Sequence, residues 1–336
     1  MMLPEDLRQS LIAMELLSTN QAGSSTKLEA EPLTGGVASD IWRVELEKTV
    51  CVKRALEQLK VSQEWRVPVS RNAFEVAWFK KVATITPQAV PAILGHDSAR
   101  GVFAMDYLPP ENYPVWKTQL HNGLVDAASI QALAIILAKI HQETAGDLAI
   151  ANEFDTDDLF YSIRIEPYLI ATAEKHTALK TQLHALARSL ILHKKALVHG
   201  DFSPKNILIG PQGPIVLDAE CAWYGDPVFD VAFCLNHLLL KCLWTPSATA
   251  AFVEGAALFL ETYLARVDWE PQETTAARVA SLLPALMLAR IDGKSPVEYI
   301  SDESDKNKVR QFSIAFLQSA TAQPEQFISA WAEAIK

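Results

Sequence analysis

One strand-like segment interrupts the helical C-terminal part of this sequence and constrains the fold more than any other feature. It reads LVHGDFSPKNILIGPQGPIVLD, with apolar strands predicted at Ile207–Ile209 and Ile215–Leu217 around a turn rich in glycine and proline. Asn206 opens the first strand and Asp218 ends the second, each six residues from Gln212. A hairpin closed at Gln212 would therefore bring Asn206 and Asp218 together at its open end.

The polar side chains at this predicted hairpin indicate a metal site and a proton acceptor. An amide oxygen from Asn206 beside a carboxylate from Asp218 suits a hard cation such as Mg²⁺. Asp201 lies five residues before Asn206, on the loop that leads into the hairpin. A carboxylate in that position could accept a proton from a substrate hydroxyl.

The remainder of the chain changes character at Pro109-Pro110, where two consecutive prolines stop regular structure. Strand patterns dominate before the two prolines, and helical patterns dominate after them. With 336 residues the chain is long enough for two lobes. We therefore expect an α+β fold with a small, β-rich N-terminal lobe at residues 1–106 and a larger, mainly helical C-terminal lobe at residues 107–336.

Hydrophobic periodicity also predicts the individual elements. In the N-terminal lobe it predicts helices at Leu3–Leu17 and from a cap at Ser70 to about Val82, and strands at Ile41–Leu46, Thr49–Ala55, Ala89–Leu94 and Gly101–Leu108. In the C-terminal lobe it predicts helices at Ser129–Gln142, Pro167–Lys194, Val228–Trp244, Ala250–Arg266, Thr275–Arg290 and Val309–Ala320.

The composition argues against several classes of function. The net charge of −10 lacks the basic footprint of nucleic-acid binders, and an acidic field attracts metal ions and amines. The four cysteines form no C-x-x-C pair, which argues against disulfides or structural zinc. The N-terminus does not resemble a signal peptide, and the apolar stretches near 130–140 and 228–244 are too short or too interrupted to span a bilayer. We expect a cytoplasmic protein with no membrane, nucleic-acid or obligate protein partner.

The hairpin segment carries a resemblance to a known family. The pattern His199-x-Asp201-x-x-x-x-Asn206, followed by Asp218, resembles the catalytic loop and metal-binding aspartate of the kinase-like fold. Gly200 stands where protein kinases have arginine. This H-G-D form is similar to that of the aminoglycoside phosphotransferase and choline kinase superfamily.

The sequence downstream extends the resemblance. Gly-Asp-Pro-x-x-Asp230 follows the hairpin as it does in that superfamily, and Asp218-x-Glu220 resembles the motif of methylthioribose kinase. The resemblance covers roughly residues 30–300, although its specific motifs lie within about 199–230. It implies a bilobal protein-kinase-like fold, with ATP or GTP as phosphate donor and Mg²⁺ as metal.

The resemblance implies roles for residues of the N-terminal lobe. Lys53, at the end of Val-Cys-Val-Lys, would hold the α- and β-phosphates, and Glu75 on the following helix would pair with it. Gly35 and Gly36, with Ser39, would form the loop over the phosphates, where the absence of side chains lets backbone N–H groups approach.

Other implied roles lie at the hinge and near the catalytic loop. The carbonyl of Asp106 and the N–H of Leu108 would bind the adenine ring. His199 and Asp230 would support the loop structurally. Glu220 could ligate the metal, directly or through water, or contact a cationic substrate, or be an ordinary solvated glutamate.

Two residues near the end of a predicted helix remain candidates for substrate binding, Arg290 and Asp292. An alternative explanation of that region is structural, because Gly293 suits a helix end and Ser295-x-x-Glu298 has the pattern of a capping box with a proline at the first helical position.

Together these features predict an ATP- and Mg²⁺-dependent phosphotransferase that acts on a hydroxyl of a small molecule, with Asp201 as catalytic base (EC 2.7.1.-). The acceptor could be an amino sugar, an amino alcohol, a thioribose-like sugar or a related metabolite. A non-enzymatic nucleotide-binding regulator is the first alternative. A protein kinase is the second, although the chain lacks A-P-E and only 11 residues separate Asp218 from Asp230.

Overall fold

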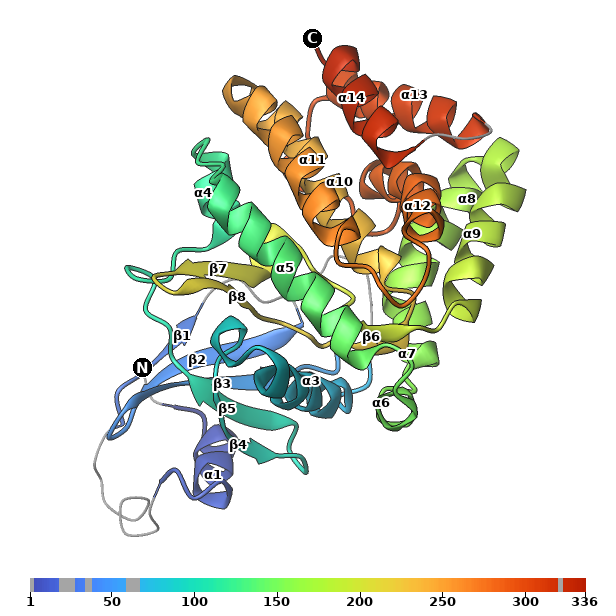
Figure 1. The fold of residues 1–336 in the computed structure, drawn as a ribbon. Coiled ribbons are helices and arrows are strands. Elements are labelled where there is room, and N and C mark those ends of the chain that lie inside the picture. Colours follow the sequence, from blue (N-terminus) through green and yellow to red (C-terminus); the bar gives the residue numbers. More distant parts are fainter. Residues whose placement is uncertain (1–2, 18–27, 34–37, 59–66, 320–322) are drawn as a thin grey trace. The chain divides into compact units, whose positions relative to one another are not determined.

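A computed structural model of the chain describes residues 3–17, 28–33, 38–58, 67–319 and 323–336. The chain forms two compact units. The N-terminal unit contains Met1–Tyr113 together with the short later segment Leu217–Cys221. The C-terminal unit contains Pro114–Val216 and Ala222–Lys336. The first is built around an antiparallel sheet and the second is mainly helical, which confirms the α+β fold class (Figure 1).

The N-terminal unit contains a five-stranded antiparallel sheet in the order β1-β2-β3-β5-β4. Its strands are β1 (Ala30–Leu33), β2 (Ser39–Glu45), β3 (Thr49–Ala55), β4 (Ile93–Asp97) and β5 (Val102–Asp106). Within the described residues, the helices α1 (Glu5–Ala13) and α3 (Arg71–Ile85) pack on it, and a short turn η1 (Pro87–Ala89) precedes β4. In β3, the central strand, Lys53 lies opposite Ile41 of β2 and Phe103 of β5.

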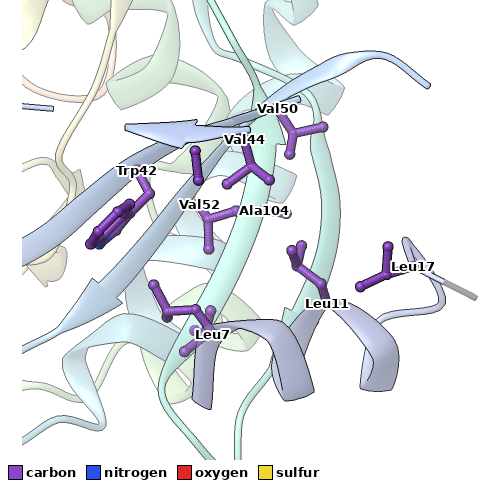
Figure 2. Packing of buried hydrophobic residues seen from close by; sticks show 10 residues of the cluster. Leu7, Leu11, Leu17, Trp42, Val44, Val50, Val52 and Ala104 are labelled. Carbon is purple, nitrogen blue, oxygen red and sulfur yellow. The ribbon is translucent and has the colours of Figure 1, made fainter. Parts of the chain in front are cut away.

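Because side chains alternate along β3, the two faces of the sheet carry different kinds of residue. Val50 and Val52 point to one face, where they join a buried apolar cluster with Leu7 and Leu11 of α1. Figure 2 shows these two leucines rising from α1 towards the strands. The opposite face carries Lys53, and α3 covers it. The alternation therefore places a charged residue inside the unit, and such a residue needs a partner.

The C-terminal unit consists mainly of helices around α10 (Val228–Trp244), which packs against α11 (Thr249–Leu264) and α12 (Gln272–Asp292) (Figure 1). Its other α-helices are α4 (Trp116–His121), α5 (Ala127–Thr144), α6 (Leu148–Glu153), α7 (Asp157–Phe160), α8 (Ala171–Lys175), α9 (Lys180–Leu192), α13 (Glu303–Gln318) and α14 (Pro324–Ala334). A π-helix η2 (Tyr161–Ile170) and short turns η3 (Thr177–Leu179), η4 (Pro204–Asn206) and η5 (Pro246–Ala248) connect them. Two short antiparallel pairs complete it, β6 (Ala196–Val198) with β9 (Trp223–Gly225) and β7 (Ile207–Gly210) with β8 (Gly213–Val216).

The helix α12 is apolar along most of its length. By length and composition it could cross a membrane, but 78% of its apolar window is buried inside the structure. It packs against α10 and α13, as a core helix of this unit does.

The predicted hairpin forms, with a shorter second strand than expected. Ile207 pairs with Val216 and Gly210 with Gly213, so the turn is centred between Pro211 and Gln212. Gly213 has φ +117°, a conformation that only glycine adopts without strain. The second strand was predicted to continue to Asp218 but ends at Val216, and Asp218 has a left-handed φ of +66°.

Several predicted boundaries were wrong for local reasons. The strand predicted at Ala89–Leu94 is instead η1 followed by β4, because Pro87 opens a short 3₁₀ turn and Pro91 lies between that turn and β4. The long helix predicted at Pro167–Lys194 is divided into η2, α8, η3 and α9. No helix follows the predicted capping box at Ser295, since α13 begins at Glu303 with Asp302 as its cap. Gly293 is extended, with φ −73°, and its missing Cβ leaves room for the carbonyl oxygens of Ala289 and Pro167.

Candidate functional site

In the N-terminal unit, Lys53 lies between two carboxylates. Its Nζ is 2.6 Å from Oε1 of Glu75 on α3 and forms a second ion pair with Oδ1 of Asp218. Lys53 and Glu75 are buried, whereas the side chain of Asp218 is 30% exposed. The short segment Leu217–Cys221 therefore presents one partly accessible carboxylate beside a buried cation.

The charges of this group are strongly coupled. Burial lowers the pKa of Lys53, but the carboxylates of Asp218 and Glu75 outweigh it and leave that pKa above its ordinary value. Burial raises the pKa of Glu75 to about 7, against the opposing effect of Lys53. The lysine is therefore kept positively charged, which suits a residue that binds phosphate oxygens.

A second buried cation, Arg71, fixes the segment that carries Asp218. Its Nε donates to Oε2 of Glu220 at 3.0 Å, and its Nη2 donates to the carbonyl oxygens of Ala38 and Leu56. Arg71 lies one helical turn before Glu75 on α3 and was not predicted as a site residue. The sequence pattern that could have identified it is its position four residues before Glu75, on the same face of the helix.

In the C-terminal unit, the loop from His199 to Asp201 is held by Asp230. The Asp230 carboxylate accepts hydrogen bonds from the backbone N–H of His199 at 2.7 Å and of Gly200 at 2.9 Å. Gly200 has φ +78°, which accounts for glycine at this position. The ring Nδ1 of His199 accepts a hydrogen bond from the N–H of Asp201. The loop is therefore fixed on both sides of Gly200.

The carboxylate of Asp201 is buried and flanked by two cations. Its Oδ2 lies 3.1 Å from Nη2 of Arg164 and 2.9 Å from Nζ of Lys205. Arg164, on the π-helix η2, also donates through Nε to the carbonyl of Gly200. These cations favour the ionised carboxylate, the form that can accept a proton. Arg164 was not predicted as a site residue, because no local pattern links it to the loop.

Asn206 and Asp218 offer oxygen atoms of the type that Mg²⁺ prefers. The Asn206 amide nitrogen donates to the carbonyl of Asp201 at 3.0 Å, which fixes the orientation of the amide group. Within the described ranges, no group of three or more His, Cys, Asp or Glu side chains is placed to hold a metal ion. A magnesium ion bound through Asn206 or Asp218 would therefore need further ligands from phosphate groups or water.

The predicted nucleotide-binding residues of the N-terminal unit are only partly described. Gly35 and Gly36 lie outside the described residues, and Ser39 is buried at the start of β2. Asp106 ends β5, and its carboxylate pairs with Lys48 at 2.6 Å. Leu108 lies in the irregular chain beyond β5.

The three predicted substrate residues all have protein partners. Asp292 accepts two hydrogen bonds from Arg310 and one from His176. Arg290 donates to the hydroxyl of Tyr168 and to Ser295, but its Nε is buried without a hydrogen-bond partner. Glu220 lies in a turn, because extended structure stops before Asp218, and its partner is Arg71. The substrate roles stay predictions, and the geometry favours Arg290 over Asp292.

Comparison with known proteins identifies relatives of the chain. Residues 29–269 match the family model described as the phosphotransferase enzyme family. Methylthioribose kinase from Pectobacterium atrosepticum is 24% identical over 257 residues, which cover 67% of this chain and 63% of that protein. The match thus spans less than two thirds of the length of this curated relative.

Solved structures show the same fold. A choline/ethanolamine kinase family protein from Mesorhizobium loti aligns with a TM-score of 0.53 and 15% identity, over 98% of each chain. Amicoumacin kinase hAmiN, solved with AMP-PNP, Ca²⁺ and Ami, aligns with a TM-score of 0.56 and 13% identity, over 97% of each chain. The family match covers well over half of the sequence, and the chain therefore belongs to the phosphotransferase enzyme family.

Proposed function

We propose that this protein is an ATP- and Mg²⁺-dependent kinase that transfers the γ-phosphate to a hydroxyl group of a small molecule (EC 2.7.1.-). GTP is the alternative donor. The observation that carries the proposal is the buried Lys53, held by Glu75 and by the partly exposed carboxylate of Asp218. Family membership and the named kinase relatives support the same activity.

In this proposal, residues 1–106 form the nucleotide-binding lobe. The Lys53 ammonium binds phosphate oxygens, and the loop with Gly35, Gly36 and Ser39 covers them. The carbonyl of Asp106 and the N–H of Leu108 bind the adenine ring.

Residues 107–336 form the lobe that supplies the catalytic loop and the acceptor site. Asp201 orients the acceptor hydroxyl and takes its proton as the oxygen bonds to the γ-phosphorus. The bond from that phosphorus to the bridging oxygen breaks at the same time, and ADP leaves. His199 and Asp230 act only through the position of the loop.

Asn206 and Asp218 would hold Mg²⁺, and Glu220 would keep the segment of Asp218 in place through its ion pair with Arg71. When bound, the ion would neutralise negative charge on the phosphate oxygens. Cytoplasmic location and the absence of nucleic-acid, membrane or obligate protein partners stay predictions.

Calorimetric titration with ATP, in the presence and absence of Mg²⁺, tests nucleotide binding. ADP release is then measured across a panel of hydroxyl-bearing metabolites. We expect Mg²⁺-dependent binding and turnover with at least one acceptor. Tight binding without turnover of any acceptor would instead favour a nucleotide-binding regulator, and absence of binding would contradict both functions.

A further inference from the structure

One face of α10 leads away from the catalytic loop and carries two basic side chains. Asp230, which holds that loop, is followed by His237 seven residues later and by Lys241 eleven residues later. At about 100° per residue, these three positions share one side of the helix. Lys241 is therefore about 16 Å along the helix axis from Asp230.

Lys241 is a buried basic side chain that forms no ion pair with a carboxylate of the described residues. It is 1% exposed, and its Nζ lies 4.5 Å from the ring centroid of Trp244 and 4.2 Å from that of Tyr299. The two rings stack with centroids 4.7 Å apart. In the described part of the chain, no hydrogen bond or ion pair joins the side chain of Lys241 to another residue. Cation–π contacts offset only part of the cost of burying an ammonium group.

Two further nitrogen atoms nearby lack partners. Nε2 of His237 and Nε of Arg290 are buried without a hydrogen-bond partner, although both residues have other contacts. His237 reaches the hydroxyl of Tyr299 through Nδ1 at 3.3 Å. Unsatisfied buried donors are uncommon, and several of them together mark a place where a ligand could supply acceptors.

The charges around Lys241 and His237 are mostly positive. Burial, aided by Lys117 and Arg290 and opposed by Glu298, lowers the pKa of Lys241 to about 7. Burial, followed by Arg290 and Lys241, holds the pKa of His237 well below its usual value. We define Lys117, His237, Lys241 and Arg290 as the basic cluster. Glu298, which pairs with Lys117, is the carboxylate that acts on Lys241.

A series of contacts joins this cluster to the catalytic loop. Arg164, which pairs with Asp201, lies over the ring of Tyr168 at 5.9 Å, and Arg290 lies over the same ring at 5.6 Å. Both guanidinium groups also lie within 6.0 Å of the ring centroid of Phe233. The basic cluster and the proposed catalytic base are therefore parts of one connected group of side chains.

We infer that the basic cluster binds an acidic group of the phosphate acceptor, either a carboxylate or a phosphate ester, so that the acceptor is an anion. This inference rests on the kinase activity proposed above and narrows its substrate class. An acidic oxygen would accept hydrogen bonds from Lys241, His237 and Arg290 and would supply the missing counter-charge. An amine in the same place would be repelled by the positive charges of Arg290 and Lys117.

Binding and turnover are measured with a matched set of probes: glycerol, glycerate, glycerol 3-phosphate and ethanolamine. Calorimetry without nucleotide, at pH 8 in two buffers of different ionisation enthalpy, measures both affinity and proton uptake. We expect the two anions to bind and glycerol and ethanolamine not to bind. Lys241 is largely neutral at this pH in the free protein, so an anion that binds beside its ammonium form should draw a proton from the buffer.

Two variants test the cluster, with one control. Lys241→Met keeps the length of the buried side chain without its charge, and we expect about 10- to 100-fold weaker binding of the anions and loss of proton uptake. Lys117→Met, at a half-exposed position, should weaken binding less without affecting folding. Lys180→Met removes an exposed lysine of α9 that pairs with Glu174 and should have no effect.

The outcomes separate this inference from the kinase proposal. Anion binding that depends on Lys241 supports the inference, whether or not ATP is consumed. ATP-dependent turnover of glycerol or ethanolamine, with no anion binding and no effect of Lys241→Met, would overturn the inference and leave the kinase activity intact. Anion binding that Lys241→Met and Lys180→Met reduce equally would also overturn it, because the charge effect would then be nonspecific.

Discussion

The Nζ of Lys53 lies 2.6 Å from Oε1 of Glu75 in the interior of the N-terminal unit, where both side chains are almost completely buried. The two residues come from β3 and α3, and their ion pair joins the sheet to the helix. Asp218 completes the group, and its carboxylate is the more exposed of the two that pair with Lys53. The pair therefore fixes a cation beside an accessible anion.

Replacement of Lys53 by methionine should abolish function and weaken the fold. Removal of one group that stabilises charge in a transition state commonly costs about 100-fold or more in rate. Loss of one member of a buried ion pair commonly lowers the free energy of unfolding by about 3–5 kcal/mol. Turnover and urea unfolding measure the two effects. Lys80→Met, at an exposed position of α3, the helix that carries Glu75, should change neither, and equal effects of the two variants would contradict the assigned role.

Gly200 and Gly146 allow a matched test of the catalytic loop. Both have left-handed backbone angles, with φ of +78° and +73°, so alanine at either position should cost about 1–2 kcal/mol of stability. Only Gly200→Ala should also reduce kcat, because it disturbs the N–H groups held by Asp230. Stability and kcat are measured for both variants. Loss of activity in Gly146→Ala as well would show that destabilisation alone explains the result.

The variant Glu220→Gln tests whether Glu220 holds its segment in place through Arg71 or ligates the metal ion. Since Glu220 is held by the buried Nε of Arg71, we expect the variant to unfold at a lower temperature and to keep the wild-type dependence of activity on Mg²⁺ concentration. Arg71→Lys should be at least as destabilising, because an ammonium group cannot replace the several hydrogen bonds of the guanidinium. A large rise in the Mg²⁺ concentration needed for half-maximal activity of Glu220→Gln would instead assign Glu220 to the metal.

The pKa of Lys241 predicts how stability changes with pH. Burial, aided by Lys117 and Arg290 and opposed by Glu298, lowers this pKa to about 7, whereas a lysine in the unfolded chain keeps its ordinary value near 10.5. Between these values the unfolded state binds the proton and the folded state does not, so this group adds stability as pH rises. Lys241→Met should therefore be more stable than wild type at pH 6, with an advantage that shrinks between pH 7 and 10. Thermal unfolding at several pH values measures this, and a constant difference would contradict it. His237 is also buried nearby, but it is already neutral across this range.

Local patterns predicted much of the fold. Alternation located β2, β3 and β5, and it placed Lys53 on the face opposite Val50 and Val52, where α3 covers it. The turn of β7 and β8 was predicted from its glycines and prolines. The extent of β8 was not, because Asp218 leaves the strand with a left-handed backbone and pairs with Lys53, which lies 165 residues earlier and which no local pattern links to it.

Residues joined only by tertiary contacts were not predicted. Arg164 reaches Asp201 from a π-helix 37 residues earlier, and Lys241 meets Tyr299 across nearly 60 residues. Their sequence surroundings resemble ordinary helices. A local pattern can also predict structure that does not form. Ser295-x-x-Glu298 matches a capping box, but no helix begins there.

Asp201→Asn tests the central claim most directly. The amide keeps the size of the side chain but cannot accept the hydroxyl proton, so calorimetry should show nearly unchanged binding of ATP with Mg²⁺. ADP release with the best acceptor should fall by about 100-fold or more. Asp158→Asn, at an exposed site in the same unit, should retain full activity. Near-normal ADP release by Asp201→Asn would contradict the assignment of Asp201 as the catalytic base.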